Sequence, residues 1–438
     1  MAPLYGAAFG FNTDRRVKPV HFATGFFIAL LGCNYRNEIL NNVVAFSDGT
    51  DLAGLYSLNN LHPELIRLGK LSSDVSKQEL RALRKHLRCL AGNDDAVFPA
   101  YAEKAGFGCD YSTAAKDILT RTKDNDGFSG FFTYSILDVT DDGRFVLDFT
   151  RSCLNAPQPT LRQIFQPLLE KDHVEEDSLS RYEARFGELD AKRVKSIAKR
   201  AEKQTKALRT LCENLNHLAA TETKLRFIII GLSLWLFRYI TEESVNSTGV
   251  ADPLALLVDV SQDSNSRMRV QSRSSYSRLR EALINGFSSF ADSGRFENCS
   301  DQWEYVKKEE QGRPKFEDFY RELSLRSGLA QPRASRIQAK HFEPQPDTLR
   351  VLVLSVINSS DGLVPFAQLL NQLYEVWGLV FGGRPQDADL LGRLCYVGLD
   401  QDRDLSPNAM CLVDLLSDLG LATKFSDGLI MCHSQPRL

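Results

Sequence analysis

The sequence predicts a mainly α-helical protein of the α+β type, with several helical domains, small β-hairpins and a C-terminal winged helix-turn-helix. Three observations lead to this prediction. A chain of 438 residues is longer than one ordinary core requires, so two or three domains are expected. Apolar residues recur at helical spacing in the middle of the chain. Residues 349–438 form a series of expected helices that a short hairpin closes.

Composition and charge place the chain among ordinary globular proteins. It is 43% hydrophobic and 25% charged, with a formal net charge of −3. Such a balance excludes no partner, because polyanion binding depends on local clusters of charge rather than on the total. The nine cysteines are scattered and include no C-x-x-C pair, which predicts free, buried thiols in a reducing compartment. We therefore expect a cytoplasmic protein.

Membrane insertion and secretion are not expected. The N-terminus lacks a charged segment ahead of an apolar one, so no secretory signal is predicted. The longest apolar runs, residues 22–33 and 227–237, are shorter than the roughly 20 residues that a membrane-spanning helix needs. Both runs are expected to be buried core helices.

Residues 1–165 are predicted to form an N-terminal helical domain with a β-hairpin. The helix expected at residues 76–91 carries a basic row beside its apolar face: Lys77, Arg81, Arg84, Lys85 and Arg88. A solvated face and a phosphate contact are both open interpretations. Residues 132–137 and 145–149 alternate on either side of Asp141-Asp142-Gly143, which predicts two strands and a tight turn. A helix followed by a hairpin could be a winged helix.

Residues 166–330 are predicted to form a helical middle domain around a long amphipathic helix at residues 189–219. A short helix is expected before it at residues 166–171. The apolar stripe of the long helix comprises Val194, Ile197, Ala201, Leu208, Leu211, Leu215 and Leu218. The opposite side carries the lysine row, which we define as Lys192, Lys195, Lys199, Lys203 and Lys206. Residues 191–209 hold eight Lys or Arg and one Glu, a local balance of +7. A second apolar helix at residues 225–240 could continue the first helix or fold back on it.

An arginine segment follows at residues 264–280. It carries Arg267, Arg269, Arg273, Arg278 and Arg280 among serines. Guanidinium groups among small hydroxyl residues can hold phosphates, but the same letters suit a flexible surface loop leading into a helix at residues 276–290. The next stretch is rich in proline and glutamine and has no periodic apolar pattern, which predicts a linker at residues 331–348.

The winged helix is expected at residues 349–438. Helices are predicted at residues 363–381 and 387–397, and a proline-started helix at residues 406–419 ends at Gly420. A hairpin at residues 421–433 completes the order. The last helix carries Asp414 and Asp418 but no Lys or Arg, so a phosphate lattice would repel it. This wing is expected to dock against protein.

Catalytic signatures are weak. Asp138 and Asp148 on neighbouring expected strands resemble the start of a metal-dependent nuclease core, but the lysine that such a core needs after Asp148 is missing. The sequence has no phosphate-binding loop motif and no paired histidines, and Asp400, Asp402 and Asp404 lack the later ligands of a calcium loop. We expect no enzyme activity, metal or cofactor.

The favoured function is therefore a non-catalytic subunit of a DNA-associated assembly, with a role in bacterial DNA processing or antiviral (phage) defence as a base-rate expectation. The basic row at 77–88, the lysine row and the arginine segment would bind phosphates without reading bases, and the winged helix would dock other protein subunits. One alternative is a pure scaffold whose basic helix pairs with an acidic protein. A second is a cryptic nuclease built on Asp138 and Asp148. Oligomeric state does not follow from the sequence.

Overall fold

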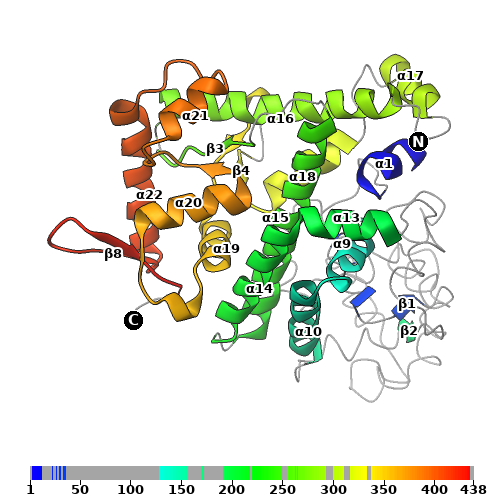
Figure 1. The fold of residues 1–438 in the computed structure, drawn as a ribbon, viewed down its shortest axis with the longest axis horizontal. Helices are drawn as coiled ribbons and strands as arrows, with labels where there is room; N and C mark the ends of the chain where they lie inside the picture. Colours follow the sequence, from blue (N-terminus) through cyan, green and yellow to red (C-terminus); the bar gives the residue numbers. More distant parts are fainter. Residues whose placement is uncertain are drawn as a thin grey trace, which may run out of the picture.

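Helices account for most of the computed structural model (Figure 1). It describes residues 2–11, 22, 26, 29–30, 33–35, 128–155, 169–171, 191–217, 220–247, 254–261, 263, 265–292, 299–309, 316–332 and 337–434. Within these residues the strands are short and form three two-stranded ladders and one three-stranded sheet. The prediction of a mainly α protein with small β elements is confirmed.

The centre of the fold is helix α15 (Thr221–Ser247). Residues 227–241 are all buried, so this helix is covered on every side. It packs against α14 (Glu202–Leu215), α16 (Arg267–Asp292), α18 (Phe316–Arg326) and α19 (Pro346–Val356). A helix that is apolar all round must lie inside a protein, and its neighbours must supply the polar surface.

The long helix expected at residues 189–219 is two helices in the structure. Helix α13 (Ala191–Arg200) and helix α14 meet at Ala201, where the chain changes direction (Figure 1). Six members of the predicted apolar stripe, from Val194 to Leu215, are buried, and Leu218 lies outside the described residues. Helix α14 ends at Leu215, and α15, which begins at Thr221, packs back against it. The two apolar helices therefore form a hairpin.

The strands predicted at residues 132–149 are wrong. These residues form helix α9 (Phe128–Asp138) and helix α10 (Asp141–Asn155). The Thr140 hydroxyl caps α10 by accepting a hydrogen bond from the Gly143 amide at 3.0 Å. Gly143 is needed for close approach, since a Cβ there would lie 2.0 Å from the Leu137 carbonyl oxygen. The acid-acid-glycine signal thus begins a helix, and the N-terminal wing is absent from these residues.

One other local prediction is wrong, and the expected linker contains ordered structure. Residues 169–171, expected in a helix, form strand β2 (Leu169–Lys171), which pairs antiparallel with β1 (Cys33–Tyr35). The expected linker at 331–348 contains a packed ladder of β4 (Ala330–Gln331) and β5 (His341–Phe342). Phe342 is fully buried and contacts the rings of Phe237 and Tyr276. Apolar side chains at β5 thus hold this stretch against α15 and α16.

The C-terminal region contains the expected helices and final hairpin, but strands lie at both ends of the helix predicted at residues 363–381. After α19 come β6 (Val364–Pro365), α20 (Phe366–Trp377), β7 (Leu379–Val380), α21 (Asp387–Arg393) and α22 (Ser406–Asp418). Strands β8 (Ala422–Lys424) and β9 (Ile430–Cys432) then form the expected hairpin. Strand β6 joins it, which gives an antiparallel sheet in the order β6–β9–β8. Strand β7 leaves this unit and pairs in parallel with β3 (Leu256–Leu257).

The described residues form two hydrophobic clusters. The smaller one includes Leu257, Val380 and Leu390, and the larger one runs from Leu4 in α1 (Ala2–Phe9) to Cys432 in β9. It crosses the boundaries expected at residues 165, 330 and 348. The Asn214 side chain of α14, for example, donates to the carbonyl oxygens of Leu354 and Ile357 at 2.7 Å. Within the described part of the chain, no helix is both long enough and apolar enough to span a bilayer.

Candidate polyanion-binding surface

The lysine row is exposed in the structure. Lys192, Lys195 and Lys199 lie on α13 and Lys203 and Lys206 on α14, and all five side chains are classed as exposed. The positions 192, 195 and 199 share one face of α13 because a helix turns about 100° per residue. Lys192 and Lys199 are separated by about 10 Å along the axis. Among the described residues none of the five ammonium groups has a carboxylate within ion-pair distance.

The arginines of the same two helices bind other residues of the chain. Arg193 donates to the Gly6 carbonyl oxygen at 3.1 Å, and Arg200 pairs with Glu243 of α15 at 2.8 Å. Arg209 pairs with Asp142 of α10 at 2.8 Å and with Glu213 at 2.9 Å. In these helices the arginines connect elements of the fold and the lysines face the solvent. The planar guanidinium group can donate to two partners at once, whereas the ammonium group is a flexible point charge.

Neighbouring carboxylates do little to neutralise the row. Glu202 is exposed in the first turn of α14, where the helix dipole favours a negative charge. Glu243 is mostly buried, and this burial raises its pKa despite the nearby charges of Arg200 and Arg193. Five exposed lysines against one exposed glutamate give the surface along α13 and the start of α14 a positive charge.

The arginine segment is a helix and its described contacts face inward. Helix α16 begins at Arg267, nine residues before the expected start. Arg269 binds Asp259 and Glu343, Arg280 binds Glu317, and Arg278 donates to the carbonyl oxygens of Leu394 and Cys395. Arg267 donates to the Gly398 carbonyl oxygen. These side chains hold α16 to α18 and to the loop after α21, so the segment is not a free arginine-rich loop.

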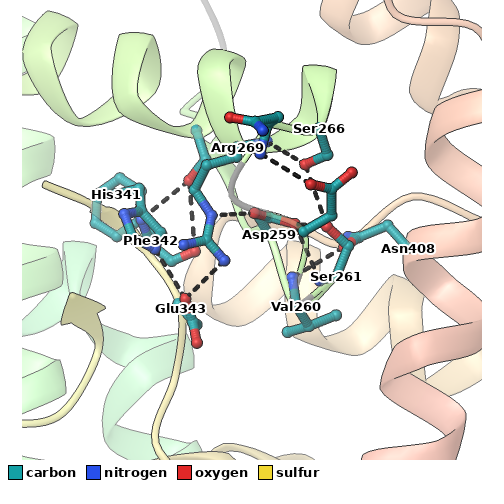
Figure 2. Close-up of polar contacts among 12 residues, drawn as sticks. Asp259, Val260, Ser261, Ser266, Arg269, His341, Phe342, Glu343 and Asn408 are labelled. Atoms are coloured by element: carbon teal, nitrogen blue, oxygen red, sulfur yellow. Dashed lines mark hydrogen bonds and ion pairs between the residues drawn. The ribbon is translucent and has the colours of Figure 1, made fainter. Parts of the chain in front are cut away.

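The carboxylate of Asp259 is the most buried ionised group in this region (Figure 2). Asp259 follows β3, and its side chain is 0% exposed. One carboxylate oxygen accepts from the Ser261 amide at 3.0 Å and from the Ser261 hydroxyl at 2.6 Å, and the other accepts from Arg269. Arg269 Nη2 lies 3.0 Å from Glu343. A buried charge needs such partners, because it loses its hydrogen bonds to water and an apolar interior offers none in exchange.

Two further polar side chains complete this network. His341 contacts Glu343 at 2.8 Å and the Ala339 carbonyl oxygen at 3.0 Å through its two ring nitrogens. Asn408 of α22 accepts from the Val260 amide at 2.9 Å and donates to the carbonyl oxygens of Val258 and Phe381. Sequence reasoning missed these residues. A single aspartate within the apolar run 254–260 was the one available signal.

The network has the character of a structural joint rather than a reactive centre. Both carboxylate oxygens of Asp259 accept hydrogen bonds from protein donors, and Asn408 ties the ends of β3 and β7 to α22. Among the described residues no group of His, Cys, Asp and Glu could hold a metal ion. The network therefore joins the ends of β3 and β5 to α16 and α22.

The remaining predicted residues are placed as follows. The basic row Lys77, Arg81, Arg84, Lys85 and Arg88 lies outside the described residues. Asp138 ends α9, and Asp148 lies on α10 with Arg151 as its ion-pair partner, so the strand pairing behind the nuclease hypothesis is absent. Asp400 accepts from the amides of Asp402 and Arg403, which is a capping role.

Five cysteines are free thiols in the structure: Cys153, Cys212, Cys395, Cys411 and Cys432. Burial raises the pKa of Cys432 to about 12, and it also raises the pKa of Cys212 well above its usual value. A thiol with a raised pKa is a poor nucleophile at neutral pH. Cys395 is exposed, although the apolar residues beside it predict burial.

Comparisons with protein-family models, with curated proteins and with solved structures give no match to this chain.

Proposed function

We propose that this protein is a non-catalytic subunit of an assembly that contacts nucleic acid, with double-stranded DNA as the favoured polyanion. The observation that carries the proposal is the lysine row: five exposed ammonium groups on two adjoining helices, none of them within ion-pair distance of a described carboxylate, beside arginines that pair with other parts of the fold. Contact through lysine suits phosphates rather than base edges, because an ammonium group is a flexible point charge. Such binding would be independent of sequence.

The arginine segment contributes little to this proposed surface. Arg269 and Arg280 are paired with Asp259 and Glu317, and breaking these partly buried pairs to reach a phosphate would expose uncompensated carboxylates. Arg267, 65% exposed, remains accessible. The proposed contact is accordingly centred on α13 and the start of α14.

The C-terminal unit is proposed to be a winged helix that docks protein. Its elements run α19, β6, α20, α22, β8, β9 with α21 inserted, and the sheet order is β6–β9–β8. This arrangement supports the winged-helix interpretation. Helix α22, in the place of a recognition helix, carries Asp414 and Asp418 and no cation, which argues against contact with phosphates. A role in DNA processing or antiviral defence in the cytoplasm stays the expectation for such a subunit.

Duplex binding measured against salt tests the nucleic-acid contact. Fluorescence anisotropy with a labelled duplex should give a steep fall of affinity with salt, since each neutralised phosphate contributes about −0.9 to the logarithmic slope. The Lys192→Ser/Lys195→Ser/Lys199→Ser variant should bind more weakly and lose about 2.7 from the magnitude of that slope. A matched control removes three exposed lysines elsewhere, Lys307, Lys308 and Lys424.

The control variant loses the same charge but should keep the wild-type slope. Equal losses in both variants would show that only net charge matters, and the lysine row would then be no site. If the wild-type protein binds no duplex at low salt, the nucleic-acid proposal is excluded. The alternative is then the scaffold function, in which the same lysines bind an acidic protein.

A further inference from the structure

The sheet β6–β9–β8 has one covered face and one open face. Register places Val364, Cys432 and Ala422 side by side, and they are 3%, 0% and 8% exposed. The adjacent positions Pro365, Met431 and Thr423 must then point to the opposite face, because side chains alternate along a strand. The first set packs on the core and the second faces outward.

The outward face is apolar, unlike the solvated face of an ordinary antiparallel sheet. Alternation extends it from Thr423 and Met431 to Phe425 and Leu429, which lie opposite each other where the Phe425 amide donates to the Leu429 carbonyl oxygen at 2.8 Å. Phe425 is 40% exposed and Leu429 is 49% exposed. The hairpin that carries them projects from the edge of the molecule (Figure 1). We define Pro365, Phe425, Leu429 and Met431 as the wing patch.

The C-terminal unit that carries the wing patch is acidic. Residues 349–434 contain five Lys or Arg and ten Asp or Glu, a balance of −5. Two of the five cations are occupied: Arg384 pairs with Asp387, and Lys424 pairs with Asp414. Asp427 lies in the turn between Phe425 and Leu429 and is exposed. An apolar surface with this surrounding field complements a segment that carries both apolar and basic side chains.

We infer that the wing patch docks a basic amphipathic segment of a partner protein. This inference rests on the proposed protein-docking role of the C-terminal unit and names the chemistry of its partner. Phe425 and Leu429 would be the apolar anchors, since large side chains at the centre of a patch carry most of the binding energy. Asp427 and the other acidic residues of the unit would select lysine or arginine at the rim.

A pair of designed peptides tests the inference on the full chain. Both peptides carry the same apolar residues at helical spacing, one with lysine and one with glutamate at the remaining positions. Anisotropy should show that the lysine peptide binds and that Phe425→Ser/Leu429→Ser weakens it by about 30-fold or more. Met410→Ser is the matched control: Met410 is 44% exposed but lies on α22 rather than on the sheet face, so binding should be unchanged. Asp427→Asn removes the charge but keeps the side-chain oxygen that accepts from the Leu429 amide at 3.0 Å, so it should weaken binding of the lysine peptide and leave unfolding by heat unchanged.

Several results would overturn the inference. These are equal binding of the two peptides, an unchanged affinity in the Phe425→Ser/Leu429→Ser variant, and equal weakening by Met410→Ser. Sedimentation that shows a dimer lost in that double variant would make a second copy the occupant. Loss of duplex binding in it would make nucleic acid the occupant. The Lys192→Ser/Lys195→Ser/Lys199→Ser variant should bind the lysine peptide normally, so failure of the nucleic-acid proposal is distinguishable from failure here.

Discussion

Replacing Arg269 by Met should be among the most damaging single changes at the centre of the protein. The substitution keeps most of the volume and removes the charge, which leaves Asp259 with only the Ser261 donors and Glu343 without its arginine partner. Asp259 is 0% exposed and Arg269 is 11% exposed, so solvent screens the pair weakly. Breaking a buried pair by removing one partner costs about 3–5 kcal/mol.

The assay is unfolding in urea, followed by circular dichroism, for wild type and variants. An exposed pair provides the comparison: Lys424 and Asp414 are 46% and 65% exposed, and Lys424→Met should cost about 0–1 kcal/mol. The double variant Asp259→Asn/Arg269→Met should recover part of the loss, because no uncompensated carboxylate then stays buried at that position. A cost for Arg269→Met as small as that of Lys424→Met, or no recovery in the double variant, would refute this account of the network.

Three further changes test individual contacts. Asn408→Leu should cost about 3 kcal/mol or more in the same unfolding assay, since the Val260 amide and the carbonyl oxygens of Val258 and Phe381 lose buried partners; a cost below that of Lys424→Met would contradict it. Gly378→Ala should cost clearly more than Gly428→Ala. Both glycines have positive φ, but only at Gly378 would a Cβ meet the Arg238 guanidinium, at 2.4 Å. Glu243→Gln should raise the melting temperature at neutral pH. Burial raises the pKa of Glu243 in the folded protein, so the protonated side chain is favoured by folding. The stability that this protonation contributes is complete below the unfolded pKa and is lost as pH rises through the folded pKa. The difference between wild type and variant should shrink as pH falls, and a constant difference would exclude this cause.

Local sequence determined the surface of the candidate site well. The 3.6-residue period predicts which positions of residues 191–215 are buried, and it places the lysines on the other side. The terminal helix and hairpin were also predictable, because Pro407, Gly420 and the turn at residues 426–428 are local stop and turn signals. Each of these features depends on residues within one or two turns of one another.

Other features had no local signature. Phe132, Tyr134 and Ile136 alternate as a strand would, yet the residues between them are equally buried, so α9 is a helix enclosed on all sides. The parallel pairing of β3 with β7 joins segments more than a hundred residues apart. Periodicity cannot distinguish a wholly buried helix from a strand, and it carries no information about which distant segment will cover a given face.

The sequence by itself therefore determined the helical class, the apolar stripe of α13 and α14, the lysine row and the terminal hairpin. Tertiary structure alone decided which cations are available. In the sequence, the arginines of α16 and the lysines of α13 are both clusters of positive charge. In the fold, Asp259, Glu317 and Glu343 come from other elements and form ion pairs with arginines of α16. None of the described carboxylates lies within ion-pair distance of the lysines. The physical reason is that helix period is a local property, whereas charge compensation depends on which chain segments the core brings together.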